Sequence, residues 1–165
     1  MKILFVCTGN ICRSPTAEGV ARRWLATAGI SGVEVDSAGI QGYHAGEAPD
    51  PRTQTAALRR GYDLSRLRAR GVKPEDFHAF DLILAMDRGH LEWLQDKAPE
   101  GTRHKIRLFM NYAPKLRRAE VPDPYYGGLN GFDVVLDLCE EAVHGLVEDI
   151  QPELERRKRQ LQMTP

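Results

Sequence analysis

The sequence predicts an α/β fold: a single three-layer domain with a central four-stranded parallel sheet and helices on both faces. Short, uninterrupted apolar runs alternate along the chain with amphipathic stretches of helical period. Such alternation is typical of parallel sheets covered by helices. The 165 residues suit one domain, and the chain has no internal repeat or linker. We expect residues 1–151 to form this domain and residues 152–165 to form a charged tail.

The first strand and the first helix have the clearest signals. The apolar run Ile3–Val6 predicts a strand buried on both faces. Ser14 and Pro15 predict the start of a helix, with Ser14 as N-cap and Pro15 at the first helical position. Gly29 is expected to end this helix. Its apolar face recurs at helical spacing and consists of Ala17, Val20, Ala21, Trp24, Leu25 and Ala28.

The middle of the chain continues the alternation. We expect a strand at 33–35 that ends in residues 36–39, followed by a glycine-rich loop at 39–46. A helix at 50–61 is opened by Asp50-Pro51 and closed by Gly61. A strand at 81–86 then precedes a helix that is capped by Asp87 and stopped by Pro99, and a weaker strand follows at 105–109.

A loop at 113–131, rich in proline and glycine, leads into the strongest helix of the chain. We expect Pro152 to end or kink this helix, and the charged residues 153–165 to fray. Its apolar face contains Val134, Val135, Leu138, Cys139, Ala142, Val143, Leu146, Val147 and Ile150.

Composition excludes several classes of protein. Lys+Arg and Asp+Glu both number 23, and this zero net charge argues against a nucleic-acid or membrane partner. No run approaches the roughly 20 apolar residues of a membrane span, and the N-terminal apolar run is too short for a signal peptide. Three cysteines are too few for a disulfide scaffold. We expect a cytoplasmic monomer with free thiols.

The first loop, Cys7–Ser14, has the spacing C-x5-R between a buried strand and a helix, and we call it the phosphate loop. Backbone amides that converge at a helix N-terminus bind dianions. Gly9 and Asn10 tolerate the left-handed conformation that such a curl needs, and Arg13 adds a planar fork that matches two phosphate oxygens. Ser14 is expected to cap the helix and to donate its hydroxyl to a thiolate at Cys7.

Thiols in such electropositive sites ionise more readily than free cysteine. We therefore expect Cys7 to attack phosphorus and form a phosphocysteine intermediate. This chemistry needs no metal, and the five histidines, at 44, 78, 90, 104 and 144, lack metal-ligand spacing. Nucleotide-binding glycine motifs are also absent from the sequence. We expect neither a metal nor a cofactor.

A second motif, Pro122–Gly128, lies in the proline-rich loop, and we call it the acid loop. It contains Asp123 followed by Pro124, Tyr125 and Tyr126. Ester hydrolysis needs an acid to protonate the leaving oxygen, and the same carboxylate can then activate water. Asp123 is the candidate for both roles.

With both motifs, the chain resembles the low-molecular-weight protein tyrosine phosphatases over about residues 2–150. The stretch 6–15, VCTGNICRSP, resembles the active-site signature of that family, and 122–128, PDPYYGG, resembles its acid loop. The intermediate segments 36–39, 43–46, 50–52 and 80–87 match as well. The resemblance implies Cys7 as nucleophile, Arg13 as phosphate clamp, Asp123 as general acid and then base, and phosphotyrosine-containing proteins as substrates.

The resemblance also implies supporting roles. Inorganic phosphate or another oxyanion would bind the phosphate loop, through Thr8, Gly9, Asn10, Ile11 and Cys12. Asn10 would be strained and held by Ser14 and Ser37. The substrate ring would lie between Tyr43 and Tyr125, with Tyr126 and His44 near the mouth. Cys12 would form a reversible disulfide with Cys7. Cys139 is expected in the core.

One position departs from the family pattern. Many members have a histidine that supports the strained asparagine, and Leu67 occupies the corresponding position here. A weaker support network would slow dephosphorylation.

Other functions compete with this interpretation. Protein arginine phosphatases resemble the chain but typically have threonine where Ile11 stands. Arsenate reductases need further cysteines that Cys139, on a core helix, does not easily supply. A phosphoprotein-binding module without activity would lack Cys7 or Asp123, and a phosphocysteine carrier is disfavoured because Arg13 and Asp123 promote hydrolysis.

Overall fold

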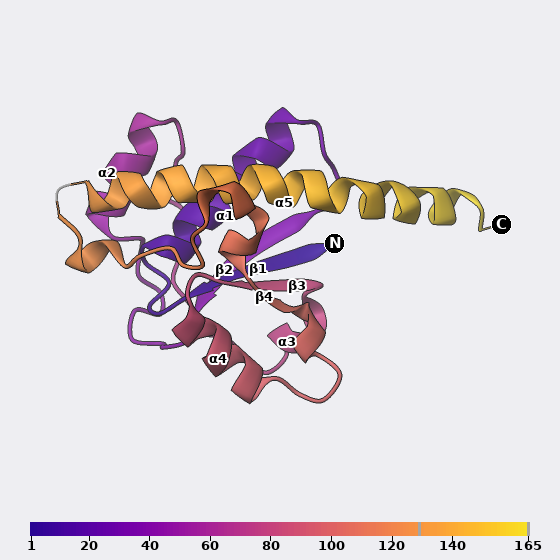
Figure 1. Ribbon diagram of the computed structural model, residues 1–165, viewed down its shortest axis with the longest axis horizontal. Coiled ribbons are helices and arrows are strands. Elements are labelled where there is room, and N and C mark those ends of the chain that lie inside the picture. Colours follow the sequence, from indigo (N-terminus) through magenta and orange to yellow (C-terminus); the bar gives the residue numbers. More distant parts are fainter. Residues whose placement is uncertain (129, 165) are drawn as a thin grey trace.

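The computed structural model describes residues 1–128 and 130–164 of the chain. Four parallel strands form one sheet in the order β2-β1-β3-β4 (Figure 1). Their bounds are Lys2–Cys7 for β1, Glu34–Gly39 for β2, Leu82–Ala85 for β3 and Ile106–Leu108 for β4. The predicted parallel sheet is confirmed, and the central strand β1 pairs with both β2 and β3.

Helices cover both faces of the sheet (Figure 1). α1, α2 and α5 lie on one face, and α3 and α4 lie on the other. Their bounds are Arg13–Thr27 for α1, Pro51–Arg59 for α2, Asp76–Ala79 for α3, Arg88–Lys97 for α4 and Gly131–Gln162 for α5. Short 3-10 turns occupy 103–105, 109–112, 114–116 and 124–126.

Side chains of β1 alternate between two separate hydrophobic cores. Ile3 and Phe5 pack on the face with α1 and α5, whereas Leu4 and Val6 pack on the face with α4. Phe5 meets Phe109 edge to face with ring centroids 5.3 Å apart. Burial on both faces explains why β1 reads as an unbroken apolar run.

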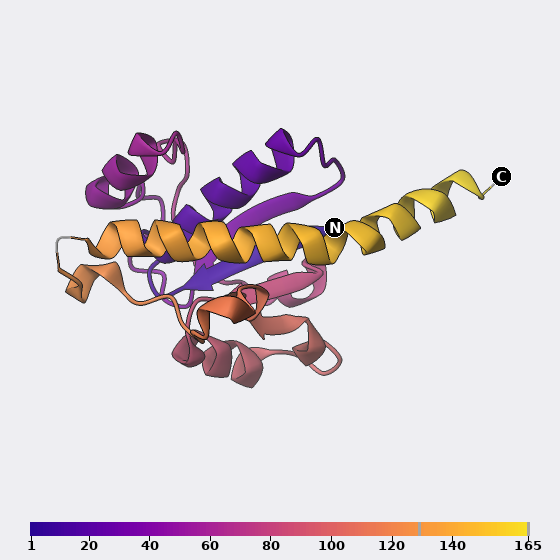
Figure 2. The same ribbon diagram turned by 45° about the horizontal axis from the view of Figure 1, so that its top comes forward.

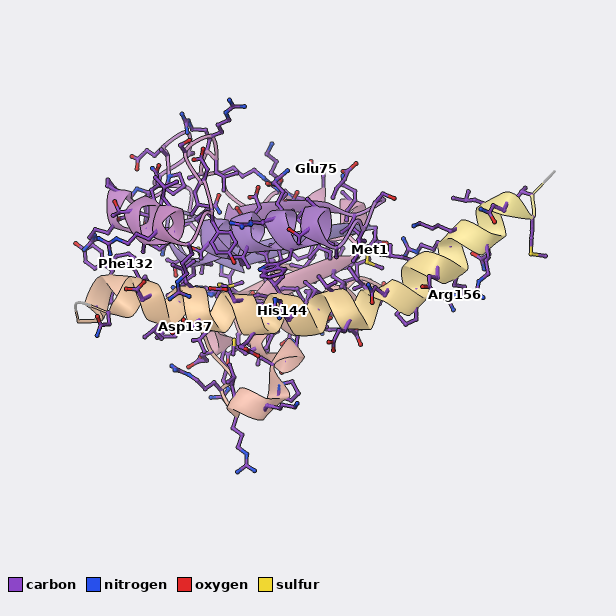
Figure 3. The ribbon with its side chains drawn as sticks, turned by 90° about the horizontal axis from the view of Figure 1, so that it is seen from above. Met1, Glu75, Phe132, Asp137, His144 and Arg156 are labelled. Atoms are coloured by element: carbon purple, nitrogen blue, oxygen red, sulfur yellow. The ribbon has the colours of Figure 1, made fainter. Side chains whose placement is uncertain are left out.

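α5 is the longest helix and runs across the whole domain (Figure 3). Gly145 permits its close approach to the turn at 109–112, since a Cβ there would lie 1.8 Å from the Tyr112 carbonyl oxygen. Figure 2 shows the C-terminal part of the helix bending away from the axis of its first part. The helix contains Pro152, which lacks the N–H needed for one helical hydrogen bond. The predicted kink is confirmed.

The predicted fraying of the chain after Pro152 is wrong for residues 153–162. These residues remain helical, Leu154 is buried, and Arg157 pairs with Asp81 at 3.4 Å. The kinked segment therefore keeps contact with the domain. The boundary between residues 151 and 152 stays a prediction.

Two other details differ from the sequence predictions. α1 begins at Arg13, and its N-cap residue, Cys12, makes no side-chain capping bond, so the prediction of Ser14 as N-cap is wrong. The short helix α3 was not predicted, because four residues cannot express a helical period. The caps at Asp50 and Asp87 are confirmed, with each carboxylate accepting a backbone amide of its helix.

In the described part of the chain, no helix has both the length and the apolarity that crossing a membrane requires.

Candidate active site

The phosphate loop follows β1 at the carboxyl edge of the sheet. Cys7 ends β1 and Arg13 begins α1. β2 fixes the start of the loop, because the Gly39 backbone lies so close to the Thr8 carbonyl that a Cβ would be 2.6 Å from its oxygen. In the part of the chain that the structure describes, the amides of residues 9–12 donate to no protein acceptor. They are therefore available to an anion at the N-terminus of α1.

Cys7 lies at the base of this loop and is only 2% exposed. Its Sγ is 2.9 Å from the Ser14 Oγ. Ser14 also accepts a hydrogen bond from the Asn10 Nδ2 at 2.8 Å, so its own hydroxyl proton is free to point at the sulfur. This position of Ser14 replaces its predicted role as helix cap.

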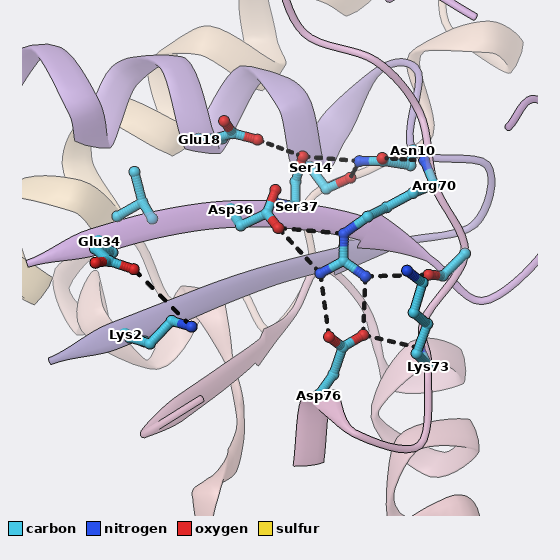
Figure 4. Close-up of polar contacts among 12 residues, drawn as sticks. Lys2, Asn10, Ser14, Glu18, Glu34, Asp36, Ser37, Arg70, Lys73 and Asp76 are labelled. Atoms are coloured by element: carbon cyan, nitrogen blue, oxygen red, sulfur yellow. Dashed lines mark hydrogen bonds and ion pairs between the residues drawn. The ribbon is translucent and has the colours of Figure 1, made fainter. Parts of the chain in front are cut away.

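Asn10 adopts the left-handed conformation, with φ of 58°. Its Nδ2 donates to Ser14 and to Ser37, at 2.8 and 2.9 Å, and its Oδ1 accepts the Arg70 amide at 3.0 Å (Figure 4). Three partners thus hold a left-handed conformation that glycine, and occasionally asparagine or aspartate, adopts routinely.

Behind Asn10 the network continues from buried groups to the surface. Ser37 donates to the Glu18 Oε1 at 2.7 Å (Figure 4). The exposed Arg22 pairs with the same carboxylate at 2.6 Å. The Arg70 side chain is held by Asp36 at 3.0 Å and by Asp76 at 2.9 Å. These ion pairs fix the segment whose amide reaches Asn10.

Leu67, which occupies the place of the expected histidine, is half-buried and packs against the core. Asn10 nevertheless has both ends of its amide engaged. The support network in this chain is therefore built without a histidine at position 67.

The Arg13 guanidinium is buried and held from two sides. Its Nη1 donates to the Asp87 Oδ2 at 2.9 Å and to the Val121 carbonyl at 3.2 Å, and its Nη2 donates to the Thr8 hydroxyl at 3.3 Å. Burial disfavours the charge on Asp87, but the His90 amide and the Arg13 charge outweigh it and lower the pKa of Asp87.

Asp123 lies beside Arg13, with its Oδ2 3.8 Å from the Arg13 Nη2. Its Oδ1 accepts the Tyr125 amide at 3.0 Å, and 39% of its side chain is exposed. The acid loop reaches the sheet through Val121, whose amide donates to the Met86 carbonyl at 2.8 Å. The structure thus brings Cys7, Arg13 and Asp123, the three predicted catalytic residues, to one edge of the sheet.

The predicted wall residues are at the surface. Tyr43 is 82% exposed, Tyr125 is 62% exposed and Tyr126 is 84% exposed. Tyr125 and Tyr126 meet edge to face at 5.3 Å, and the Arg52 guanidinium lies 5.2 Å from the Tyr125 ring centroid. The substrate-wall role of Tyr43 and Tyr125 stays a prediction.

His44 lies against the phosphate loop, because a Cβ on Gly9 would be 2.9 Å from its Cδ2. Its Nδ1 is 2.8 Å from the Glu47 Oε2. Ile11 is half-buried, and its carbonyl accepts the Asp50 amide at 2.9 Å.

Cys7, Cys12 and Cys139 are all free thiols. Burial raises the pKa of Cys12 to about 11, and burial also raises the pKa of Cys139, in the core. The disulfide between Cys7 and Cys12 stays a prediction. In the described residues, no three His, Cys, Asp or Glu side chains form a group that could hold a metal ion.

Several residues of the site were not predicted: Glu18, Arg70, Asp87 as partner of Arg13, and His90. Asp87, Arg70 and His90 contact the phosphate loop from distant parts of the chain, and Glu18 is linked to it through Ser37. A carboxylate such as Glu18 on the apolar-facing side of a helix is the one sequence signal that indicates a buried polar network.

This fold and this loop define a class: cysteine-based phosphatases of the α/β type. The family model described as low molecular weight phosphotyrosine protein phosphatase matches residues 2–158, and the chain belongs to this family.

A low molecular weight protein-tyrosine-phosphatase of Streptomyces coelicolor is 44% identical over 160 residues, covering 94% of this chain and 97% of that protein. A protein tyrosine phosphatase of Entamoeba histolytica, crystallised with Hepes in its active site, has a TM-score of 0.89 at 39% identity. That alignment covers 93% of this chain and 98% of that one. The Drosophila arginine phosphatase is also similar, with a TM-score of 0.84 at 29% identity, over 92% of this chain and 98% of that one.

Proposed function

We propose that this protein hydrolyses phosphotyrosine in proteins through a phosphocysteine intermediate on Cys7. The observation that carries the proposal is the placement of the Cys7 sulfur. It lies 2.9 Å from the Ser14 hydroxyl, below a loop whose amides at 9–12 are unpaired in the described chain, at the N-terminus of α1. Such a site stabilises both a thiolate and a dianion.

In the first step the Cys7 thiolate attacks phosphorus. The S–P bond forms as the bond between phosphorus and the phenolic oxygen breaks, and Asp123 gives its proton to that oxygen. The loop amides and the Arg13 guanidinium stabilise the equatorial oxygens of the transition state. Asp87 and the Val121 carbonyl, which both hold the Arg13 Nη1, keep the guanidinium in place.

In the second step water attacks the phosphocysteine. Asp123, now a carboxylate, takes a proton from the water, the S–P bond breaks and the sulfur leaves as a thiolate. The Ser14 hydroxyl, directed to the sulfur, stabilises it as it leaves. Amides and guanidinium supply the positive charge in both steps, so the proposed reaction needs no metal.

The preference for phosphotyrosine rests on the mouth of the site. Tyr125 and Tyr126 offer exposed aromatic faces next to Asp123, and Ile11 adds an apolar side chain to the loop. The ring of an aryl ester can make edge-to-face or offset contact with such faces. Hydrolysis of phosphoarginine is the second candidate, since the fold is shared with an arginine phosphatase.

The decisive comparison is turnover of phosphotyrosine, phosphoserine and phosphoarginine peptides of identical flanking sequence, in the presence of a chelator. We expect the phosphotyrosine peptide to have the highest kcat/KM. Faster turnover of phosphoarginine would overturn the substrate class, and a requirement for added metal would overturn the mechanism.

The Cys7→Ser variant tests the nucleophile. A serine hydroxyl is far less ionised than a thiol at neutral pH, so we expect loss of at least about 1000-fold in kcat. Binding of inorganic phosphate is expected to persist, because the amides and Arg13 remain. Residual turnover of a tenth or more would exclude Cys7.

A further inference from the structure

A buried histidine that the proposed reaction does not use lies beside the phosphate loop. His90 is the third residue of α4 and is 2% exposed. Its Nε2 lies 2.8 Å from the hydroxyl of Thr8, the first residue after β1. This contact joins residues 82 positions apart in the sequence, and it connects the phosphate loop to the opposite helix layer.

The direction of the hydrogen bonds follows from their donors. Arg13 can only donate, so the Thr8 oxygen accepts from the Arg13 Nη2 at 3.3 Å. The His90 Nδ1 lies 3.1 Å from the Asp87 Oδ1, without hydrogen-bond geometry. A bare ring nitrogen would be repelled by this carboxylate oxygen, so we assign the ring proton of His90 to Nδ1. The bare Nε2 then accepts the Thr8 hydroxyl proton.

The surroundings keep His90 in this accepting form. Arg13, Asp87, Asp123 and Glu120 are the charged groups that face it. Burial and the charge of Arg13 lower the pKa of His90 to about 4, and the three carboxylates oppose this only in part. A protonated imidazole would place a second donor on a hydroxyl that already accepts from Arg13.

The contacts close into a ring of four residues. Asp87 accepts the Arg13 Nη1 through Oδ2 at 2.9 Å and the His90 backbone amide through Oδ1 at 2.9 Å. Both terminal nitrogens of the guanidinium are thus tied, one directly to Asp87 and one through Thr8 and His90. If Asp87 alone held Arg13, the Nη2 of the guanidinium would lack the restraint that Thr8 and His90 provide.

We propose that His90 is a positioning residue of the phosphate site. By accepting the Thr8 hydroxyl proton, it orients that hydroxyl toward Arg13 and so fixes the plane of the guanidinium fork and the first residue of the phosphate loop. The inference rests on the proposed function, because it assigns the fork to the transferred phosphoryl group. His90 does not touch the substrate and acts through Thr8 and Arg13.

The test uses Thr8→Val, which removes only the hydroxyl, His90→Leu, which removes the acceptor, and the double variant. For each single variant we expect a loss of about threefold to tenfold in kcat/KM and in affinity for inorganic phosphate, as for one hydrogen bond to a charged network. The double variant is expected to lose no more than the worse single variant, because both changes cut one link. Thr8→Ser and His90→Gln, which keep a hydroxyl and an acceptor, are expected to recover most of the loss.

Thr102→Val is the matched control. Thr102 is buried like Arg13 and His90, but its hydroxyl donates to the Pro99 carbonyl, away from the phosphate loop. It is expected to lower thermal stability while phosphate affinity stays at the wild-type value.

Unchanged phosphate affinity and kcat/KM in Thr8→Val would overturn the proposal, even if His90→Leu failed to fold. Losses that multiply in the double variant would overturn it as well. Both results presuppose that the wild type and Thr102→Val hydrolyse an aryl phosphate. If neither does, the proposed function itself fails.

Discussion

The two halves of the candidate site are built differently. The phosphate loop is buried: Cys7, Asn10, Arg13 and Ser14 are all nearly inaccessible. The side chains of Asn10 and Arg13 have hydrogen-bond partners from distant segments, and Ser14 links Asn10 to Cys7 within the loop. The acid loop is exposed. Among the residues that the structure describes, Asp123 bonds only to the Tyr125 amide of its own turn, apart from its 3.8 Å approach to Arg13.

This difference matches the two tasks in the proposed reaction. Stabilising charge on a phosphoryl group needs donors that are fixed before the substrate arrives, since reorganisation would cost free energy at the transition state. An acid that serves substrate and then water needs access to both. The contrast therefore predicts that damage to the phosphate loop affects oxyanion binding, whereas damage to the acid loop affects only proton transfer.

After Cys7→Ser, the largest effect is expected from Asp123→Asn. Loss of the acid should lower kcat about 100- to 1000-fold for an aryl phosphate with a poor leaving group. With a good leaving group the first step needs little protonation, so its loss should be much smaller. Burst kinetics that separate the two steps, together with phosphate inhibition, provide the measurement.

Asp63→Asn is the matched control for Asp123→Asn, because Asp63 also accepts an amide two residues ahead, that of Ser65, but lies outside the site. It should leave all rates unchanged. Two results in Asp123→Asn would contradict the assignment of proton transfer to the acid loop and oxyanion binding to the phosphate loop. One is an equal loss of kcat for substrates with good and poor leaving groups, and the other is a tenfold weaker phosphate affinity.

The next effect concerns His90 and pH. His90 has a folded pKa of about 4 against 6.5 for the free side chain. Between these values the unfolded chain binds a proton that the folded protein does not, so stability falls as pH drops from 6.5 toward 4 and is unaffected above 6.5. The full shift corresponds to about 3 kcal/mol.

The measurement is chemical denaturation of wild type and His90→Gln at pH 7 and pH 4. The stability difference between the two proteins should move by up to about 3 kcal/mol in favour of the variant at the lower pH. A difference that does not depend on pH would show that His90 titrates normally.

Ser37→Ala tests the support of Asn10 on the buried side. It removes the acceptor of the Asn10 Nδ2 and the donor to the Glu18 carboxylate, and leaves both groups short of a partner. We expect a stability loss of about 1–3 kcal/mol and a modest loss of phosphate affinity. Thermal unfolding and phosphate inhibition measure both effects. Wild-type thermal stability and wild-type phosphate affinity in this variant would mean that Asn10 keeps its left-handed conformation without Ser37.

The smallest effects are expected at the exposed mouth. Tyr125 has a ring contact with Arg52, whereas Tyr126 has only its neighbour Tyr125. Tyr125→Ala should raise KM for a phosphotyrosine peptide by about threefold to tenfold, as for loss of one aromatic contact, and Tyr126→Ala by less. A larger rise in KM for Tyr126→Ala than for Tyr125→Ala would mean that Tyr126, and not Tyr125, contacts the substrate ring.

The sequence was sufficient for the sheet, its helix layers and the two loops, because strands buried on both faces and capped helices leave local patterns. Ile3–Val6 and the stripe of α1 are examples. Local patterns misassigned Ser14, since a serine before proline looks like a cap whether or not its hydroxyl reaches back to Cys7.

Contacts across the fold could not be predicted in the same way. Asp87 was recognised as a cap of α4, and it is one, but its other oxygen holds Arg13, 74 positions earlier. The segment after Pro152 was expected to fray because its composition is charged, yet Leu154 and Arg157 find partners on the domain. Neither pairing has a local sequence signal.

The central claim is that the Cys7 sulfur carries the phosphoryl group between the two steps. Enzyme quenched in alkaline denaturant during turnover of an aryl phosphate, then digested and sequenced by mass spectrometry, tests it directly. We expect a phosphoryl group on Cys7 that is absent from Cys7→Ser. A phosphoryl group on any other residue, or turnover with none on the protein while product forms in a burst, would contradict it.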